Sequence, residues 1–227
     1  MAEEKSDIVR GVIVEFDFTV LDGAQILFDT AKNLLAEEGV ELTVKREALH
    51  LAGGNYQGGI AELYRALGVS KEASKTARTL ANTFAAALTE KVPTAMTPGF
   101  KAFVKALADK GLKVVLATRA DVEVLKAALD GFDPAMVVPY AEQSMTYGNC
   151  KWDAWNRALS ANGLVNVLTV GVTGSGYGVK AALVAGMSAL AVVHDHVAYQ
   201  DFGGADAVTD ALDAKFADEV FRMLHLA

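Results

Sequence analysis

The fold is decided by residues 11–22, which read GVIVEFDFTVLD. Residues 12–14 form a short β-branched run, typical of a parallel strand that is buried on both faces. Glu15 and Asp17 follow at its carboxyl end. Because residues two apart on an extended chain point to the same side, we expect both carboxylates to face one crevice, at the edge where open α/β sheets bind ligands. Two buried like charges need a cation or a proton between them. The alternative is a solvated strand end with two ordinary surface acids.

The composition argues against several classes of protein. The chain has 227 residues, enough for one α/β core and a smaller unit. Its 21 basic and 28 acidic residues give a net charge of −7 without a basic cluster, which disfavours nucleic acid and anionic membranes as partners. No apolar run reaches the roughly 18 residues of a membrane span. The polar, acidic N-terminal segment does not resemble a signal peptide, and a single cysteine, Cys150, fits a reducing compartment, so we expect a cytoplasmic protein.

Residues 22–92 show no strand pattern and are predicted to form an all-helical insertion. Within them, residues 52–59 read AGGNYQGG, with four glycines in eight residues, and are predicted to be a loop. This loop either faces the substrate or is a plain linker; in the first case Asn55 and Tyr56 are candidate substrate-binding residues. The helices are expected at about residues 24–38, 45–51, 59–67 and 71–88.

Residues 93–227 alternate between strand and helix patterns and, with residues 1–21, are predicted to form the core domain. Such regular alternation predicts an α/β fold with a Rossmann-like, doubly wound parallel sheet and helices on both faces. Strands are expected at about residues 112–117, 136–138, 167–172 and 189–193, and helices at 99–110, 121–129, 152–161, 179–185 and 210–224.

Polar groups stand at the ends of these strands or before the helices. Glu15 and Asp17 follow the first strand and Thr118 ends the second, while Lys151 precedes a helix and the glycine-rich residues 174–178 follow a later strand. A carboxylate pair, a hydroxyl donor, a lysine and a glycine-rich helix entry are the groups needed to hold a phosphoryl group and spread its charge. Each of them also has a purely structural interpretation, such as a helix cap or a surface lysine.

Taken in this order, the motifs resemble those of the haloacid dehalogenase superfamily of aspartate-nucleophile phosphatases. Residues 12–22 resemble its first motif and residues 114–119 its second, and Lys151 stands where the third motif has its lysine. Residues 178–187, GVKAALVAGM, are similar to the segment that follows the fourth motif. The resemblance covers nearly the whole chain and implies a phosphatase-type core with the helical cap of the first subgroup.

The resemblance also implies roles for individual residues. Glu15 occupies the nucleophile position, Asp17 that of the general acid/base, Thr118 that of the phosphoryl hydrogen-bond donor and Lys151 that of the charge-stabilising cation. Mg²⁺ would be held by Glu15 and Asp17. The residues expected to contact the substrate are Thr19, Arg119, Asn55, Tyr56 and Ser175.

Three departures from the family pattern stand out. Glutamate at position 15 replaces the nucleophilic aspartate, and its extra methylene moves the carboxylate by about 1.5 Å, where a misplacement of about 1 Å can cost roughly a hundredfold in rate. The acid of the fourth motif would stand at Gly174 or Thr173, and neither is acidic. Phe18 replaces a small glycine. A site with one carboxylate fewer would hold Mg²⁺ weakly.

We therefore expect a phosphatase-like protein with weak or lost hydrolase activity that retains a crevice for phosphate or a small phosphorylated molecule. The first alternative is an active Mg²⁺-dependent phosphohydrolase. A second is a dinucleotide (NAD) binder, because residues 174–178, GSGYG, and Asp195 partly fit that fingerprint, although the glycine spacing and the late position disfavour it. The loop would otherwise be a backbone nest for phosphate. His194 and His196 form an incomplete metal-ligand pattern, and the sequence leaves the oligomeric state open.

Overall fold

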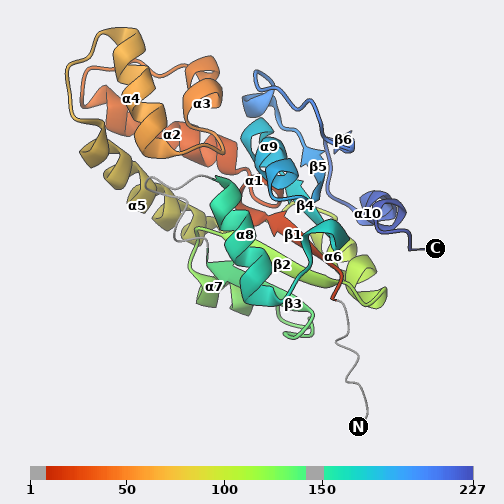
Figure 1. Cartoon of the computed structure of the whole chain (residues 1–227). Coiled ribbons are helices and arrows are strands. Elements are labelled where there is room, and N and C mark those ends of the chain that lie inside the picture. Colours follow the sequence, from red (N-terminus) through yellow and green to blue (C-terminus); the bar gives the residue numbers. More distant parts are fainter. Residues whose placement is uncertain (1–8, 142–150, 227) are drawn as a thin grey trace.

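The computed structural model describes residues 9–141 and 151–226. Its described strands form one six-stranded parallel sheet in the order β3-β2-β1-β4-β5-β6, as Figure 1 shows. This order confirms the predicted Rossmann-like fold and places β1 where the strand order reverses, the position at which open α/β sheets bind ligands. The strands are β1 (Gly11–Glu15), β2 (Lys113–Thr118), β3 (Val137–Ala141), β4 (Thr169–Thr173), β5 (Ser188–Val192) and β6 (Ala207–Thr209).

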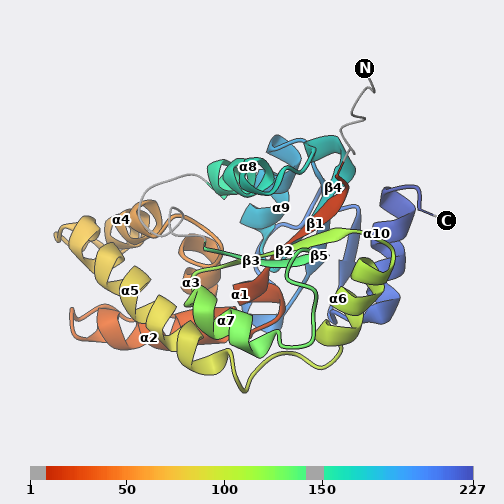
Figure 2. The same ribbon diagram turned by 90° about the horizontal axis from the view of Figure 1, so that it is seen from below.

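Helices cover both faces of the sheet, and a second group of helices lies beside the carboxyl end of β1 (Figures 1 and 2). The helices that cover the sheet are α6 (Phe100–Asp109), α7 (Val122–Ala128), α8 (Lys151–Asn162), α9 (Gly176–Val184) and α10 (Ala217–Met223). A short turn, α1 (Phe16–Thr19), leads to the second group, which contains α2 (Gly23–Ala36), α3 (Val44–His50), α4 (Tyr56–Leu67) and α5 (Ala73–Lys91).

Alternation of side chains along β1 explains why the sheet is buried on both faces. Val12 and Val14 belong to one hydrophobic core, which includes Phe103 of α6. Ile13, between them, belongs to a second core with Trp155 of α8. Since all five residues of β1 are buried, this strand is fixed at the centre of the molecule and its carboxyl end has a defined position.

The helices α2 to α5 form the helical cap expected from the sequence. Leu27, Ile60, Leu80 and Phe84 are fully buried and continuous with the core on one face of the sheet. The exact boundary of the cap at residues 22–92 stays a prediction. In the part of the chain that the structure describes, no helix is both long and apolar enough to cross a membrane.

Only the first half of the glycine-rich segment 52–59, which was predicted to be a loop, is one. Its second half belongs to α4, which begins at Tyr56 and is capped by Asn55, whose Oδ1 accepts a hydrogen bond from the Gly58 backbone N–H at 3.0 Å. Gly59 is needed for packing rather than for flexibility, because a Cβ there would lie 1.9 Å from the His50 carbonyl oxygen. The prediction was wrong because glycine was interpreted as a helix breaker, whereas here it permits a close approach.

The C-terminal region contains three further differences from the predicted elements. The strand β6 was missed, because its three residues are too short to show an alternating pattern. Residues 167 and 168, predicted to begin a strand, lie in a 3-10 turn (Asn166–Leu168). The final helix begins at Ala217, after a 3-10 turn capped by Asp213, and not near residue 210.

Candidate active site

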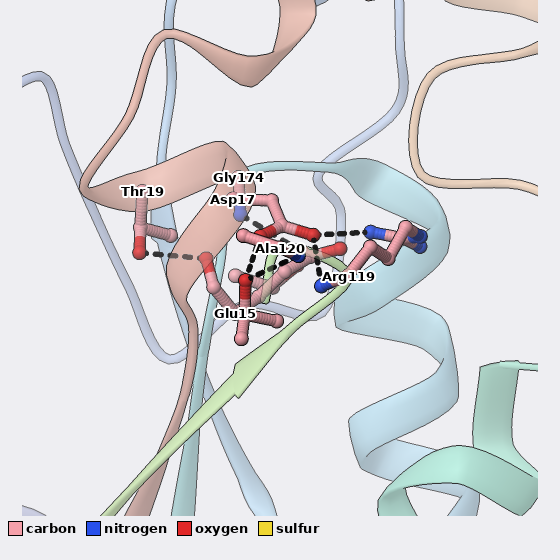
Figure 3. A network of polar contacts seen from close by, with 8 residues as sticks. Glu15, Asp17, Thr19, Arg119, Ala120 and Gly174 are labelled. Atoms are coloured by element: carbon pink, nitrogen blue, oxygen red, sulfur yellow. Dashed lines mark hydrogen bonds and ion pairs between the residues drawn. The ribbon is translucent and has the colours of Figure 1, made fainter. Parts of the chain in front are cut away.

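The chain leaves the extended conformation directly after Glu15, because the turn α1 begins at Phe16. The expectation that Glu15 and Asp17 point to the same side of an extended chain was therefore wrong. Both carboxylates lie at the carboxyl end of β1 and are buried, but they bind to different neighbouring strands (Figure 3). We call Asp17, Thr118 and Arg119 the β2 flank, and Glu15, Thr173 and Gly174 the β4 flank.

In the β2 flank, three donors from the end of β2 and the next residue occupy the Asp17 carboxylate. The Thr118 hydroxyl donates to Oδ1 at 2.5 Å, and Oδ2 accepts from the backbone N–H and from the guanidinium of Arg119, both at 3.0 Å. The side chains of Asp17 and Arg119 are 0% and 1% exposed, so this is a fully buried ion pair. Thr118 in turn accepts a hydrogen bond from the Ala120 N–H, which fixes its hydroxyl.

In the β4 flank, two neutral groups donate hydrogen bonds to the Glu15 carboxylate. Glu15 Oε2 accepts hydrogen bonds from the Thr173 hydroxyl and, at 3.3 Å, from the Gly174 backbone N–H. The longer glutamate side chain therefore reaches across from β1 to the end of β4. Thr19 lies beside it, and its hydroxyl donates to the Glu15 carbonyl oxygen at 2.8 Å.

Gly174 has no room for the acid that the family's fourth motif would place there. A Cβ atom at this position would lie 2.0 Å from the carbonyl oxygen of Phe18 and 2.7 Å from its Cβ. Real Cβ atoms do not come this close to backbone atoms, so any side chain here requires the α1 turn to move. The absence of an acid at position 174 and the position of the Phe18 backbone are thus linked, because the Phe18 backbone occupies the space that a side chain at position 174 would need.

Phe18 links this site to the cap through a row of aromatic rings. Its ring centroid lies 5.6 Å from Cζ of Arg119 and 6.0 Å from the ring of Phe84 on α5. Phe84 packs edge to face on Tyr56 of α4, at 6.2 Å. Tyr56, predicted to contact the substrate, is 1% exposed and belongs to this packing.

The glycine-rich loop that follows β4 uses its backbone N–H groups within the protein. Ser175 caps α9, because its Oγ accepts from the Gly178 N–H at 3.0 Å, and its own N–H donates to Thr173 Oγ1. The Gly176 N–H donates to the side chain of Gln200 at 2.7 Å. These contacts are those of a tightly packed helix entry, and they occupy backbone amides that a phosphate or dinucleotide would use.

The structure brings together only some of the residues predicted to form the site. Glu15, Asp17, Thr118, Arg119 and, beside them, Thr19 cluster at the carboxyl end of β1, whereas Asn55 lies at the start of α4 as a helix cap. Lys151 begins α8, but its side chain lies outside the described residues, as does Cys150. His194 and His196 are half-buried, and the His196 ring packs 5.5 Å from that of Phe28.

A cleft of about 550 Å³ opens next to the β2 flank. One wall is α5, with Asn82 and Thr89, and the other is the end of β2 and the segment after it, with Arg119 and Asp121. The Asp121 N–H donates to Thr89 Oγ1 at 2.9 Å, which joins the two walls at one end. The volume of this cleft is typical of small-molecule sites. No sequence motif indicated the α5 residues of this cleft, because they lie far from every motif.

Glu47 on α3 is a buried acid that the sequence analysis missed. It is 0% exposed, and burial raises its pKa from 4.5 to about 8. Neither of its carboxyl oxygens has a hydrogen-bond partner among the described residues. An isolated glutamate in a helical pattern looks like an ordinary surface residue, so only the packing of α3 against neighbouring elements distinguishes it.

Comparison with known proteins identifies the family. A sequence model of the haloacid dehalogenase-like hydrolase family matches residues 12–192, and the chain therefore belongs to this family. A search of curated proteins found no match.

Similar solved structures share this fold. They include a hydrolase from Pseudomonas syringae, with 21% identity and a TM-score of 0.72 over 92% of this chain and 98% of that one. β-Phosphoglucomutase from Clostridium difficile has 15% identity and a TM-score of 0.74 over 97% and 100%. CbbY from Rhodobacter sphaeroides, in complex with phosphate, has 18% identity and a TM-score of 0.67 over 92% and 96%. At these identities the likeness shows the fold alone.

Haloacid dehalogenase-like hydrolases generally use Mg²⁺, but the described residues of this chain do not fit that ion. Mg²⁺ requires near-octahedral oxygen ligands and loses its water reluctantly. Here the Asp17 carboxylate already accepts three hydrogen bonds, Glu15 Oε2 accepts two, and Gly174 admits no acid. Across residues 9–141 and 151–226, no group of three or more His, Cys, Asp or Glu residues is placed to hold a metal ion.

Proposed function

We propose that this haloacid dehalogenase-like protein has lost all or nearly all phosphohydrolase activity and binds a small phosphorylated molecule in the cleft between α5 and the end of β2. The observation on which the proposal depends is that both carboxylates of the first motif are buried and engaged by neighbouring groups. Asp17 is held by Arg119 and Thr118, and Glu15 by Thr173 and Gly174.

The geometry of both acids supports a loss of hydrolysis. A general acid/base must lie within hydrogen-bond reach of the proton that it transfers, and Asp17 is instead directed into an ion pair with Arg119. A nucleophile must approach phosphorus in line, whereas Glu15 Oε2 is directed toward the end of β4. Asp17 would have to exchange its partners before reacting, and so would Oε2 of Glu15.

Binding of a phosphorylated ligand is supported by the position and chemistry of the cleft. It lies at the carboxyl ends of β2 and β3, where α/β proteins bind ligands. Thr118 and Arg119 line it, and the exposed side chain of Asn82 offers a further hydrogen-bonding group. CbbY, which has a similar fold, was crystallised with phosphate.

Hydrolysis is tested with Mg²⁺ and a generic aryl phosphate, comparing the unmodified protein with Glu15→Ala and Glu15→Asp. We expect the unmodified protein to show no turnover above Glu15→Ala. Turnover that is well above the assay background and is abolished by Glu15→Ala would contradict the proposal. It would support the alternative, an active Mg²⁺-dependent phosphohydrolase that uses Glu15.

Ligand binding is tested by calorimetric titration with inorganic phosphate and, separately, by blocking the cleft. Ala86 on α5 is an exposed residue of the cleft wall, and Ala127 on α7 is an exposed residue outside it. We expect Ala86→Trp to weaken phosphate binding at least tenfold and Ala127→Trp to leave it unchanged. No binding by the unmodified protein, or equal binding by both variants, would contradict the location.

A further inference from the structure

We propose that the Arg119 guanidinium takes the place of the divalent cation, so that this site neutralises Asp17 with a cation from its own chain and is independent of metal. The inference extends the proposed function. Its consequence for ligand binding rests on that function. Metal binding itself can be tested without phosphate, so a failure of one proposal is distinguishable from a failure of the other.

The first step is the position of the positive charge. The guanidinium lies 3.0 Å from Asp17 Oδ2, in a contact whose two side chains are excluded from solvent. The same oxygen accepts the backbone N–H of Arg119, so a single residue supplies two donors from the strand end. An arginine stays charged at every physiological pH, which makes this cation a permanent part of the site.

The second step is that the departures from the family pattern support this arginine together. The Phe18 ring lies beside the guanidinium, in a position that favours a cation. The backbone of the same residue approaches Gly174 so closely that no acid fits there. The residue that accommodates the internal cation thus also excludes a carboxylate that would strengthen metal binding.

The third step is the balance of charge at Asp17. Arg119 offsets the negative charge of this carboxylate from within hydrogen-bond distance. Mg²⁺ at the same carboxylate would place a second cation against the guanidinium, and it would first have to shed part of its water. The ion therefore competes with Arg119 rather than adding to it.

The test uses the intact protein in two experiments. In the first, Mg²⁺ alone is added and the unfolding temperature is measured. In the second, Mn²⁺ alone is added and its binding is measured by electron paramagnetic resonance. The variants are Arg119→Gln, which removes the charge but keeps an amide donor, and Asp17→Asn/Arg119→Gln, which also removes the anion. Arg222→Gln is the matched control, because Arg222 forms an exposed ion pair with Glu219 on the surface of α10.

We expect the unmodified protein and Arg222→Gln to show no bound Mn²⁺ and a shift in unfolding temperature of less than about 1 °C with Mg²⁺. Arg119→Gln should bind Mn²⁺ and gain about 5–10 °C when Mg²⁺ is a hundred times its dissociation constant. The double variant should lose this response. Binding of Mn²⁺ by the unmodified protein would overturn the proposal even if Arg119→Gln does not fold, and so would a folded Arg119→Gln that binds no metal.

Discussion

The two flanks of β1 hold equally buried carboxylates in different ways. In the β2 flank, Asp17 is paired with a cation, the guanidinium of Arg119. In the β4 flank, the described donors to Glu15 are a hydroxyl and a backbone N–H. Sequence comparison alone marks Glu15 as the altered residue and Asp17 as the retained one. The structure shows that the retained Asp17 is itself fully engaged, and an ion-pair partner can change the role of an unchanged side chain.

Glu47 provides a third case against which both flanks can be compared. It is as deeply buried as Glu15 and Asp17, but its carboxyl oxygens have no hydrogen-bond partner among the described residues. Burial without a partner disfavours the ionised form, which is why its pKa rises to about 8.

The largest effect is expected from removing the cation of the β2 flank. Arg119→Ala leaves Asp17 buried without its ion-pair partner and should lower the free energy of unfolding by roughly 3–5 kcal/mol. Urea unfolding measures this directly. Arg222→Ala breaks an exposed pair and should cost less than about 1 kcal/mol. Equal losses in the two variants would mean that burial does not strengthen the Asp17 pair.

Glu47 should make stability depend on pH in a defined direction. Folded Glu47 keeps its proton up to about pH 8, whereas in the unfolded chain it ionises near 4.5. Between these values the unfolded state binds fewer protons, so the free energy of unfolding falls as pH rises, by up to roughly 1.4 kcal/mol per pH unit, and levels off above about pH 8.

Glu47→Gln removes this titration. Relative to the unmodified protein, the variant should therefore gain up to about 3 kcal/mol between pH 6 and pH 8. Urea unfolding at several pH values measures the two slopes. If the slopes of the variant and the unmodified protein coincide, Glu47 is not the group that titrates.

The β4 flank should respond to loss of a neutral donor. Thr173→Val removes the hydroxyl that donates to Glu15 Oε2 while keeping the shape of the side chain, and should cost roughly 1.5–3 kcal/mol. Thr173→Ser keeps the hydroxyl and is the matched control, with a smaller loss. Chemical unfolding of the two variants at pH 7 gives the difference. A serine variant as unstable as the valine variant would show that the hydrogen bond to Glu15 contributes little.

Because the Phe18 carbonyl oxygen lies so close to Gly174, even a methyl side chain at position 174 should lower the stability of the protein. Gly174→Ala forces the α1 turn to shift and should cost roughly 1–3 kcal/mol. The control is Gly54→Ala, where the nearest atom to a new Cβ lies 3.8 Å away, and its stability should change by less than about 1 kcal/mol. If Gly174→Ala is as stable as Gly54→Ala, an acid at position 174 becomes sterically possible.

The fold was largely predictable from the sequence because its signals are local. The apolar run at residues 12–14, the strand–helix alternation after residue 93 and the helical pattern before it specify the sheet and the cap. Element boundaries failed where glycine served packing, as at Gly59, or where an element was very short, as in β6.

The sequence predicted where several candidate site residues lie, but not which groups their side chains contact. Glu15, Asp17, Thr118 and Arg119 were expected at the strand ends and lie there. No sequence pattern indicates that the Arg119 side chain turns back onto Asp17, because that depends on the α1 turn and on the Phe18 ring. Contacts between distant segments, such as Glu15 with Thr173, likewise depend on the register of β1 and β4.

The most direct test of this account is a high-resolution crystal structure grown in the presence of Mg²⁺ and phosphate. We predict that the Arg119 guanidinium stays on Asp17 Oδ2 and that no density for a metal ion appears between Glu15 and Asp17. A Mg²⁺ ion bound to either carboxylate, with Arg119 displaced from Asp17, would contradict it.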